Sequence, residues 1–405
     1  MASFFARAAE QPVEKLAQSP LCARALEWIE RNARWVTEQQ VRVTEIPAPE
    51  WQEAGRAEYM RRLFEEMRFD ARIDQTGNVV AERPGVDPEG VILLAAHLDT
   101  VFPAGTDARV KRNGARLQGP GISDNGAGLA AILGVARAFA ESPVRTAKTV
   151  VFAGDVGEEG EGNLRGIRAL VEHYGSRLSA VIAVDGPSIE HITVQGIASR
   201  RFEITVKGPG GHSWSDFGRP NPITALSRGI VRFSSVSVSQ NPRTSFNFGS
   251  IAGGTSVNSI PAQASVKVDL RSESESELAR LEASLREAMR AAIRQETEAV
   301  GAPSSDLELN FRSLGSRPAG KLPENSPLLD VIREIDSFLG NQSRIEHSST
   351  DANIPLSLGI PAISLGGGGT GGGAHTASEW YDPTGRALGL KRLYLVAIAL
   401  AGIRR

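Results

Sequence analysis

Short apolar runs alternate with segments of helical periodicity in the first half of the chain. Residues 91–96, 149–154 and 179–184 are mostly apolar over the length of a strand, which is typical of strands buried on both faces. Between them, residues 127–141 and 166–173 place apolar side chains at the spacing of one helix face. This alternation predicts an α/β sheet that is covered by helices on both faces.

The pattern changes in the second half. Residues 201–207, 245–251 and 264–270 alternate polar and apolar side chains, as strands with one solvated face do. Helical periodicity is found over residues 222–233 and 275–300. This part of the chain is therefore expected to form a small α+β domain.

The first pattern returns towards the C-terminus, with a helix predicted over residues 326–339, a strand over 360–365 and a closing helix over 385–403. A larger domain interrupted by a smaller one explains this order, because insertions are tolerated where the ends of the host chain lie close together. The predicted parts are residues 1–195 and 312–405 for the larger domain and residues 196–311 for the inserted one.

The charge balance and the length of the apolar runs argue against two classes of partner. The 405 residues include 45 lysines and arginines and 47 aspartates and glutamates, a net charge of −2, so nucleic acid is not an expected partner. The apolar runs are far shorter than the roughly 20 residues that a membrane-spanning helix needs, so no membrane association is expected.

Two local features bear on the compartment and on metal chemistry. Arg7 interrupts the N-terminal segment where an export signal needs an apolar core, so a cytoplasmic location is predicted. Cys22 is the only cysteine, which excludes an intrachain disulfide and a thiolate cluster. Any metal must therefore be held by histidine and carboxylate side chains.

Carboxylates and imidazoles gather where the predicted strands end. The carboxyl ends of parallel strands are the usual place of a site in an open α/β sheet. By itself each signal has an ordinary explanation: a hydrogen-bonded His-x-Asp pair, a solvated pair of glutamates, or an aspartate that forms a turn. Their joint occurrence in order favours a site. The residues are His97, Asp99, Asp124, Glu158, Glu159, Asp185 and His375.

Residues 366–373 are all glycine except Thr370. Composition alone leaves open a flexible loop or a binding loop. The position directly before His375 favours the binding loop.

At this point the sequence resembles a known family, the co-catalytic di-zinc peptidases and amidohydrolases that include peptidase T, glutamate carboxypeptidase, succinyl-diaminopimelate desuccinylase and aminoacylase. The resemblance runs from about Ile46 to Glu379, and its motifs are specific in combination. They are His97-Leu-Asp-Thr-Val101, Gly121-Ile-Ser-Asp-Asn-Gly126, Glu158-Glu159-Gly160, Gly210-Gly-His-Ser213, Asn258-Ser-Ile-Pro261, Asp269-Leu-Arg271 and His375-Thr376. It implies a catalytic domain with a mixed sheet covered by helices and an inserted lid or dimerisation domain.

The resemblance also implies the metal ligands. His97 and Asp185 are expected to bind one zinc ion. Glu159 and His375 are expected to bind the other, and Asp124 to bridge the two. Imidazole and carboxylate suit Zn²⁺, and cobalt or manganese are expected substitutes.

Further roles follow from the same resemblance. Asp99 is expected to orient the ring of the first histidine ligand, and Glu158 to act as the general base. In the inserted domain, Arg271 and Asn258 resemble residues that hold the carboxylate and backbone of a substrate. His212 resembles the histidine that stabilises the oxyanion, supplied across the interface in dimeric members, so a homodimer is expected. Without the resemblance, His212 and Arg271 are ordinary turn and surface residues.

The predicted function is a zinc-dependent, aminopeptidase-like hydrolase that cleaves an amide bond of short peptides. Asp185 and the segment Ser349-Thr-Asp-Ala-Asn353 look like peptidase T, whereas deacylase and desuccinylase branches carry glutamate at the position of Asp185. The alternatives are an N-acyl-amino-acid amidohydrolase or deacylase, a carboxypeptidase of the same family, and a non-catalytic binding protein with the same fold. The intact Glu158 argues against the last.

Overall fold

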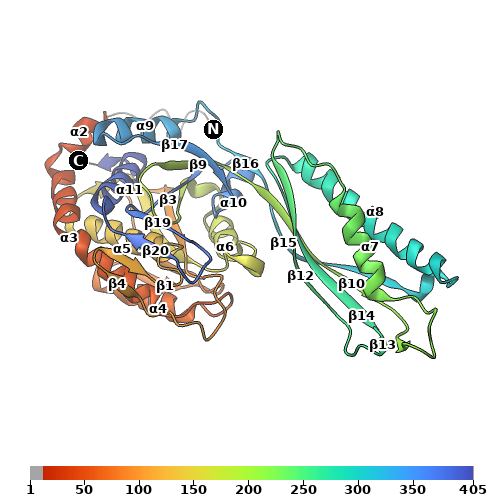
Figure 1. Cartoon of the computed structure of the whole chain (residues 1–405). Helices are drawn as coiled ribbons and strands as arrows, with labels where there is room; N and C mark the ends of the chain where they lie inside the picture. The colour runs from red at the N-terminus through yellow and green to blue at the C-terminus, as the bar shows by residue number, and fades with distance from the viewer. Residues whose placement is uncertain (1–11, 405) are drawn as a thin grey trace. The chain divides into compact units, whose positions relative to one another are not determined.

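The computed structural model describes residues 12–404, and the chain divides into two compact units, each with its own core (Figure 1). The first unit comprises Met1–Gly196 and Gly320–Arg405, and the second comprises Ile197–Ala319. The insertion expected over residues 196–311 ends inside strand β15 (Glu308–Arg317), which still pairs with β10 (Ala198–Lys207). The polar–apolar alternation fades after Phe311, so the sequence pattern gives no sign of the rest of the strand.

A large mixed sheet forms the middle of the first unit. Four parallel strands lie at its centre in the order β7-β3-β8-β18, and antiparallel strands extend it on both sides. Within the described residues its strands are β1 (Asp70–Ile73), β2 (Val79–Arg83), β7 (Lys148–Asp155), β3 (Asp87–His97), β8 (Leu178–Val184), β18 (Ala362–Leu365), β9 (His191–Gly196), β16 (Gly320–Lys321) and β17 (Arg344–Ser348).

Helices cover both faces of this sheet. The chain runs from β3 through α5 to β7, then back through α6 to β8 on the other side of β3; right-handed crossovers in opposite directions place α5 and α6 on opposite faces. Both expectations, an α/β class and a mixed sheet under helices, are confirmed. The helices are α2 (Val13–Ala17), α3 (Pro20–Thr44), α4 (Ala54–Glu66), α5 (Gly126–Glu141), α6 (Arg165–Tyr174), α9 (Pro327–Leu339), α10 (Asn353–Ser357) and α11 (Arg386–Ala401).

Smaller ladders complete the unit: β4 (Lys111–Asn113), β5 (Arg116–Gln118), β19 (Thr370–Gly372) and β20 (Trp380–Asp382) form one sheet, and β6 (Arg145–Thr146) pairs with β21 (Ile403–Arg404). The glycine segment before His375 is not a flexible loop at its start. Gly366–Gly369 are buried, and a Cβ atom on Gly389 would lie 2.3 Å from the Cα atom of Gly368. Glycine is needed here because two backbones pack against each other.

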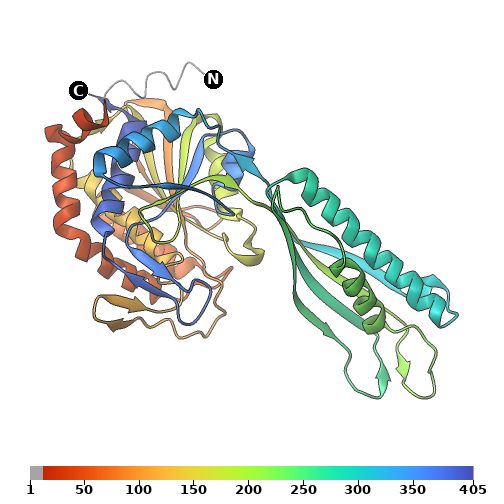
Figure 2. The ribbon, with the colours of Figure 1, turned by 45° about the horizontal axis from the view of Figure 1, so that its top comes forward.

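The second unit is an antiparallel sheet in the order β12-β14-β10-β15, with α7 and α8 side by side along it (Figure 2). Along β14 buried residues alternate with more exposed ones, as predicted from the alternating sequence. Its core includes Phe202, Phe233 and Leu285. The remaining elements are α7 (Pro222–Ser234), α8 (Glu275–Ala299), β11 (Gly211–His212), β12 (Thr244–Gly253), β13 (Ser259–Ile260) and β14 (Gln263–Ser272).

Within residues 12–404, no helix has both the length and the apolar character that crossing a membrane requires. The N-terminal segment around Arg7, on which the predicted location depends, lies outside the described residues.

Candidate metal centre

Asp124 lies between two histidines that come from distant parts of the first unit. Its Oδ1 atom is 3.1 Å from Nε2 of His97, and its Oδ2 atom is 3.1 Å from Nε2 of His375. Asp185 lies on the His97 side, 3.8 Å from the same ring nitrogen, and Glu159 lies on the His375 side, with its Oε1 atom 3.0 Å away. Two groups of potential metal ligands therefore share one carboxylate.

The sheet order brings these residues together. His97 is the last residue of β3, and Asp185 directly follows β8, the parallel neighbour of β3. Parallel neighbours end at the same edge of a sheet, so the two side chains meet there. Asn125 caps the start of α5 and also binds the backbone of Val184 and Gly186, which ties the Asp124 turn to the segment around Asp185.

The loop after β7 is held by Asp99. Its two carboxylate oxygens accept the backbone N–H groups of Glu158 and Glu159, at 3.0 and 2.9 Å. Its backbone carbonyl accepts the Nδ1–H of His97 at 3.1 Å, whereas its carboxylate is 3.7 Å from that nitrogen. The ring is thus oriented mainly by the carbonyl, and the carboxylate mainly orders the two glutamates. When the ring is neutral, this tautomer directs the Nε2 lone pair of His97 towards Asp124 and Asp185.

Glu379 holds the turn that carries Asp124. Its carboxylate accepts the backbone N–H groups of Gly121, Ser123 and Asp124, at 2.7 to 2.9 Å, and the hydroxyl of Ser123 at 2.8 Å. Glu379 is fully buried and lies four residues after His375. One carboxylate therefore links two ligand-bearing loops.

The electrostatics of the protein without metal reflect these contacts. Burial of His97 disfavours its charged form, but the neighbouring carboxylates of Asp124, Asp185 and Asp99 outweigh burial and raise its pKa. Hydrogen bonds with Asp124 and Glu159 raise the pKa of His375 to about 10. Burial would raise the pKa of Asp124, but the two histidines lower it.

The donor set fits divalent cations. No lysine or arginine in residues 12–404 forms an ion pair with Asp99, Asp124, Glu159 or Asp185, so the ion pairs of these carboxylates are with His97 and His375. Imidazole and carboxylate ligands, with a carbonyl fixing the tautomer of one histidine, are typical of zinc and related metals. His97, Glu158 and Glu159 form a third possible group, so position alone leaves either glutamate as a ligand.

In the second unit, His212 and Asn258 lie at the same two-stranded sheet, formed by β11 and β13. His212 in β11 pairs with Ser259 in β13, and the carbonyl of Asn258 accepts the N–H of Ser213 at 3.0 Å. The Nδ1 atom of His212 accepts the N–H groups of Trp214 and Ser215, at 3.2 and 3.3 Å. Its exposed ring therefore keeps Nε2–H as a hydrogen-bond donor.

Arg271 lies at the other end of the same unit. It pairs with Ser199 near the end of β14, whereas the β11–β13 sheet with His212 lies near the start of that strand, since β13 ends at Ile260 and β14 begins at Gln263. The eight steps from Gln263 to Arg271 span about 26 Å at about 3.3 Å each. Asn258 thus lies with His212 and not with Arg271. Arg271 donates to Asp269 at 2.6 Å, and its side chain is 43% exposed.

Several residues that order the site had no separate signal in the sequence. Arg56 is fully buried and donates to the carbonyls of Ile46 and Leu98, at 2.8 and 2.7 Å; burial lowers its pKa to about 10. Asp155 is buried near the centre, and burial is the main cause that raises its pKa. Burial likewise raises the pKa of Asp351, which lies in the segment that the sequence had singled out at residues 349–353. Spacing offered only one hint, the position of Glu379 shortly after His375.

Comparison with known proteins agrees with this arrangement. The model of "Peptidase family M20/M25/M40" matches residues 93–398, more than half of the chain. A putative succinyl-diaminopimelate desuccinylase, DapE, of Mycobacterium tuberculosis is 26% identical over 331 residues, which cover 80% of this chain and 87% of the relative.

Two solved structures share the fold. Aminopeptidase PepT of Bacillus cereus superposes with a TM-score of 0.71 at 19% identity and covers 92% of this chain and 99% of its own. A dinuclear metal-binding peptidase of the M20 family from Bacillus subtilis gives a TM-score of 0.66 at 19% identity, with the same coverage. At these identities the likeness establishes the fold.

Proposed function

This chain belongs to peptidase family M20/M25/M40, a family of metal-dependent hydrolases, and we propose that it cleaves an amide bond of di- or tripeptides with two bound zinc ions. The observation that carries the proposal is the position of Asp124, with one carboxylate oxygen facing each histidine. A carboxylate so placed suits a pair of cations.

The proposed ligands follow the two groups around Asp124. His97 and Asp185 hold one cation, Glu159 and His375 hold the other, and Asp124 is shared. When bound, the cations supply positive charge that lowers the pKa of the attacking water and polarises the scissile carbonyl. The buried Asp99 and Glu379 keep the ligand loops in position through the backbone.

Glu158 is the proposed general base. It is 5% exposed and neighbours the ligand Glu159, and the N–H bond to Asp99 fixes its backbone. From this place its carboxylate takes a proton from the attacking water and returns it to the leaving amine.

His212 and Arg271 are proposed to bind substrate from different subunits of a homodimer. Arg271 lies about 26 Å along β14 from Gln263, the end of the strand near which His212 lies, so the two side chains of one unit cannot both touch a di- or tripeptide. Arg271 offers a guanidinium for the terminal carboxylate, and the partner copy offers the Nε2–H donor of His212 for the oxyanion.

Short peptides are favoured over acylated amino acids by Asp185 and by the Ser349–Asn353 segment. Asp351 and Thr350 in this segment are buried, and the negative charge of Asp185 helps to raise the pKa of Asp351. The segment therefore lies close to the proposed metal ligands. N-acyl-amino-acid hydrolysis remains the second candidate because the desuccinylase relative spans most of the chain.

The deciding experiment is a substrate panel. The protein, loaded in turn with zinc, cobalt or manganese, is given free di- and tripeptides, their N-acetylated and C-amidated forms, longer peptides, and N-acetyl and N-succinyl amino acids. We expect free di- and tripeptides to be cleaved and each capped form to react about 10–150-fold more slowly, the loss expected for one charge-assisted hydrogen bond.

A Glu158→Gln preparation purified in parallel controls for contaminating peptidases. Hydrolysis of acylated amino acids with free tripeptides untouched would replace the peptidase proposal by the amidohydrolase one. No hydrolysis of any substrate by metal-loaded protein would favour a binding protein.

A further inference from the structure

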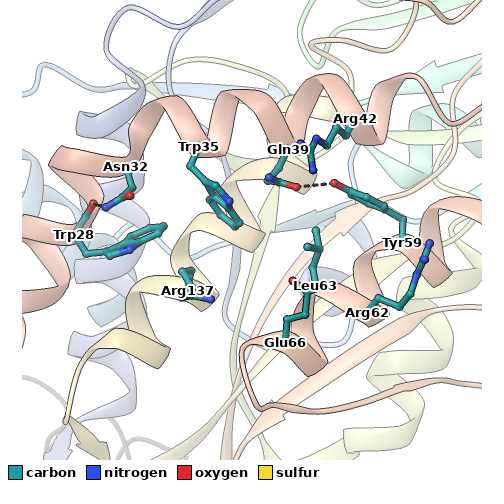
Figure 3. Close-up of a pocket in the computed structure, with 10 residues that line it drawn as sticks. All are labelled: Trp28, Asn32, Trp35, Gln39, Arg42, Tyr59, Arg62, Leu63, Glu66 and Arg137. Carbon is teal, nitrogen blue, oxygen red and sulfur yellow. Dashed lines mark hydrogen bonds between the residues drawn. The ribbon is translucent and has the colours of Figure 1, made fainter.

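A pocket of about 380 Å³ lies between α3, α4 and α5 in the first unit, apart from the metal centre (Figure 3). Side chains of α3 face those of α4 across it, and Arg137 reaches it from α5. The proposed metal ligands are not among its lining residues, and it lies within the size range of small-molecule sites. The lining residues are Trp28, Asn32, Trp35, Gln39, Arg42, Tyr59, Arg62, Leu63, Glu66 and Arg137.

Two tryptophans give the pocket flat apolar surface. Trp28 and Trp35 lie one above the other on α3, edge to face, with ring centroids 5.8 Å apart. Both rings are only partly buried, and Leu63 of α4 is partly buried on the opposite side. A flat ring entering here would gain apolar burial and aromatic contacts.

The polar side of the pocket is pre-ordered. Gln39 is 3% exposed, and its Oε1 atom accepts the hydroxyl of Tyr59 at 2.6 Å. Arg42 lies one helical turn after Gln39 on α3, at the edge of the pocket (Figure 3), and its positive charge acts on the Tyr59 hydroxyl. The Gln39–Tyr59 contact and Arg42 thus form one polar side of the pocket.

The charges of the pocket favour an anion. Three arginines line it against one carboxylate, that of Glu66. Arg137 pairs with Glu141 at 2.8 Å, and Arg62 lies 3.8 Å from Glu58. Arg42 has no carboxylate partner in the part of the chain that the structure describes. The guanidinium of Arg42 is thus available to bind one negatively charged group of a ligand.

We propose that this pocket is an accessory site for a small planar aromatic carboxylate. The ring lies against Trp28, Trp35 and Leu63, and the carboxylate binds the guanidinium of Arg42, whose fork matches a carboxylate. Glu66 and the two paired arginines disfavour a multiply charged ligand such as a nucleotide. The site does not depend on hydrolysis at the metal centre.

Calorimetry on the full-length protein tests the proposal with indole-3-acetate as the probe. We expect one saturable site per chain, and binding at least about tenfold weaker for 3-methylindole, which lacks the carboxylate, and for acetate, which lacks the ring. Arg42→Gln should weaken indole-3-acetate about tenfold or more, and Trp28→Leu should weaken it as well.

Arg31→Gln is the matched control, because Arg31 also lies on α3 but pairs with the exposed Glu27 and does not line the pocket. Its affinity should equal that of the unchanged protein. Thermal unfolding establishes that each variant is folded; Arg42 is exposed, so its variant decides the matter if Trp28→Leu unfolds. No saturable binding up to about 10 mM, or equal binding by Arg42→Gln, would overturn the proposal. Equal affinity for acetate alone would reduce the site to a non-specific anion contact and overturn it too.

Discussion

The carboxylate of Glu379 accepts the backbone N–H of Asp124 at 2.8 Å, across 255 residues of sequence. The glutamate after one histidine of the centre thereby fixes the carboxylate that faces both histidines. The same side chain accepts from Gly121 and Ser123, so one buried carboxylate holds three backbone N–H groups of this turn.

Glu379→Gln is expected to weaken metal binding by about 10–100-fold, as loss of supporting contacts around metal ligands typically does. The amide places an N–H donor where the carboxylate accepts a backbone N–H, so at least one contact is lost. Competition against a chelator measures the affinity, and circular dichroism establishes folding. Glu324→Gln is the control, since the side chain of Glu324 is 89% exposed and pairs with Lys321. Unchanged affinity in Glu379→Gln would show that the turn holds its shape without the carboxylate.

Glu158→Gln should lower kcat at least about 100-fold while two metal ions per chain remain bound. The reason is that an amide cannot accept the proton of the attacking water. Metal analysis and steady-state kinetics check both parts. Loss of one metal ion would instead assign Glu158 as a ligand, through the group that it forms with His97 and Glu159. Retained activity would exclude it as the base.

Mixing inactive His212→Ala protein with inactive Glu158→Gln protein should restore part of the activity once subunits exchange. In a mixed dimer one site receives an intact Glu158 from one chain and an intact His212 from the other. Exchange is followed with differently tagged chains. Proven exchange without recovered activity would mean that His212 does not act across subunits.

Metal binding should release protons and grow stronger as the pH rises. In the metal-free protein the pKa of His375 is raised to about 10 and that of His97 is also raised, so both rings are protonated at neutral pH and lose their protons to bind a cation. Calorimetry at pH 7 in buffers of different ionisation enthalpy should show the release of close to two protons for each pair of cations bound. In the His375→Ala variant the number of protons released should fall by one. Metal binding without proton release would contradict the protonated state of the two histidines.

The raised pKa of His375 also makes the stability of the metal-free protein depend on pH. The folded-state pKa of His375 lies above its ordinary value of 6.5, so its contacts with Asp124 and Glu159 stabilise the metal-free protein below that pH. The contribution is then lost as the pH rises towards about 10.

The sequence alone determined the elements and the inventory of the centre. The apolar run at residues 149–154 lies within β7, and the helical pattern at 127–141 matches α5 to within a residue, because burial on both faces and a 3.6-residue period are properties of the local sequence. The order of carboxylates and histidines at strand ends indicated a site, and the family resemblance added the expectation of metal ligands.

Only the tertiary structure decided which residues support one another. Glu379 contacts the Asp124 turn, and Arg56 contacts the chain beside Asp99, because strand order and loop packing bring distant segments together. Asn258 and Arg271 were expected to act together, yet the antiparallel register places them near opposite ends of β14. An alternating pattern states which face of a strand is buried, but it carries no information on partner or register, which depend on contacts between segments far apart in the chain.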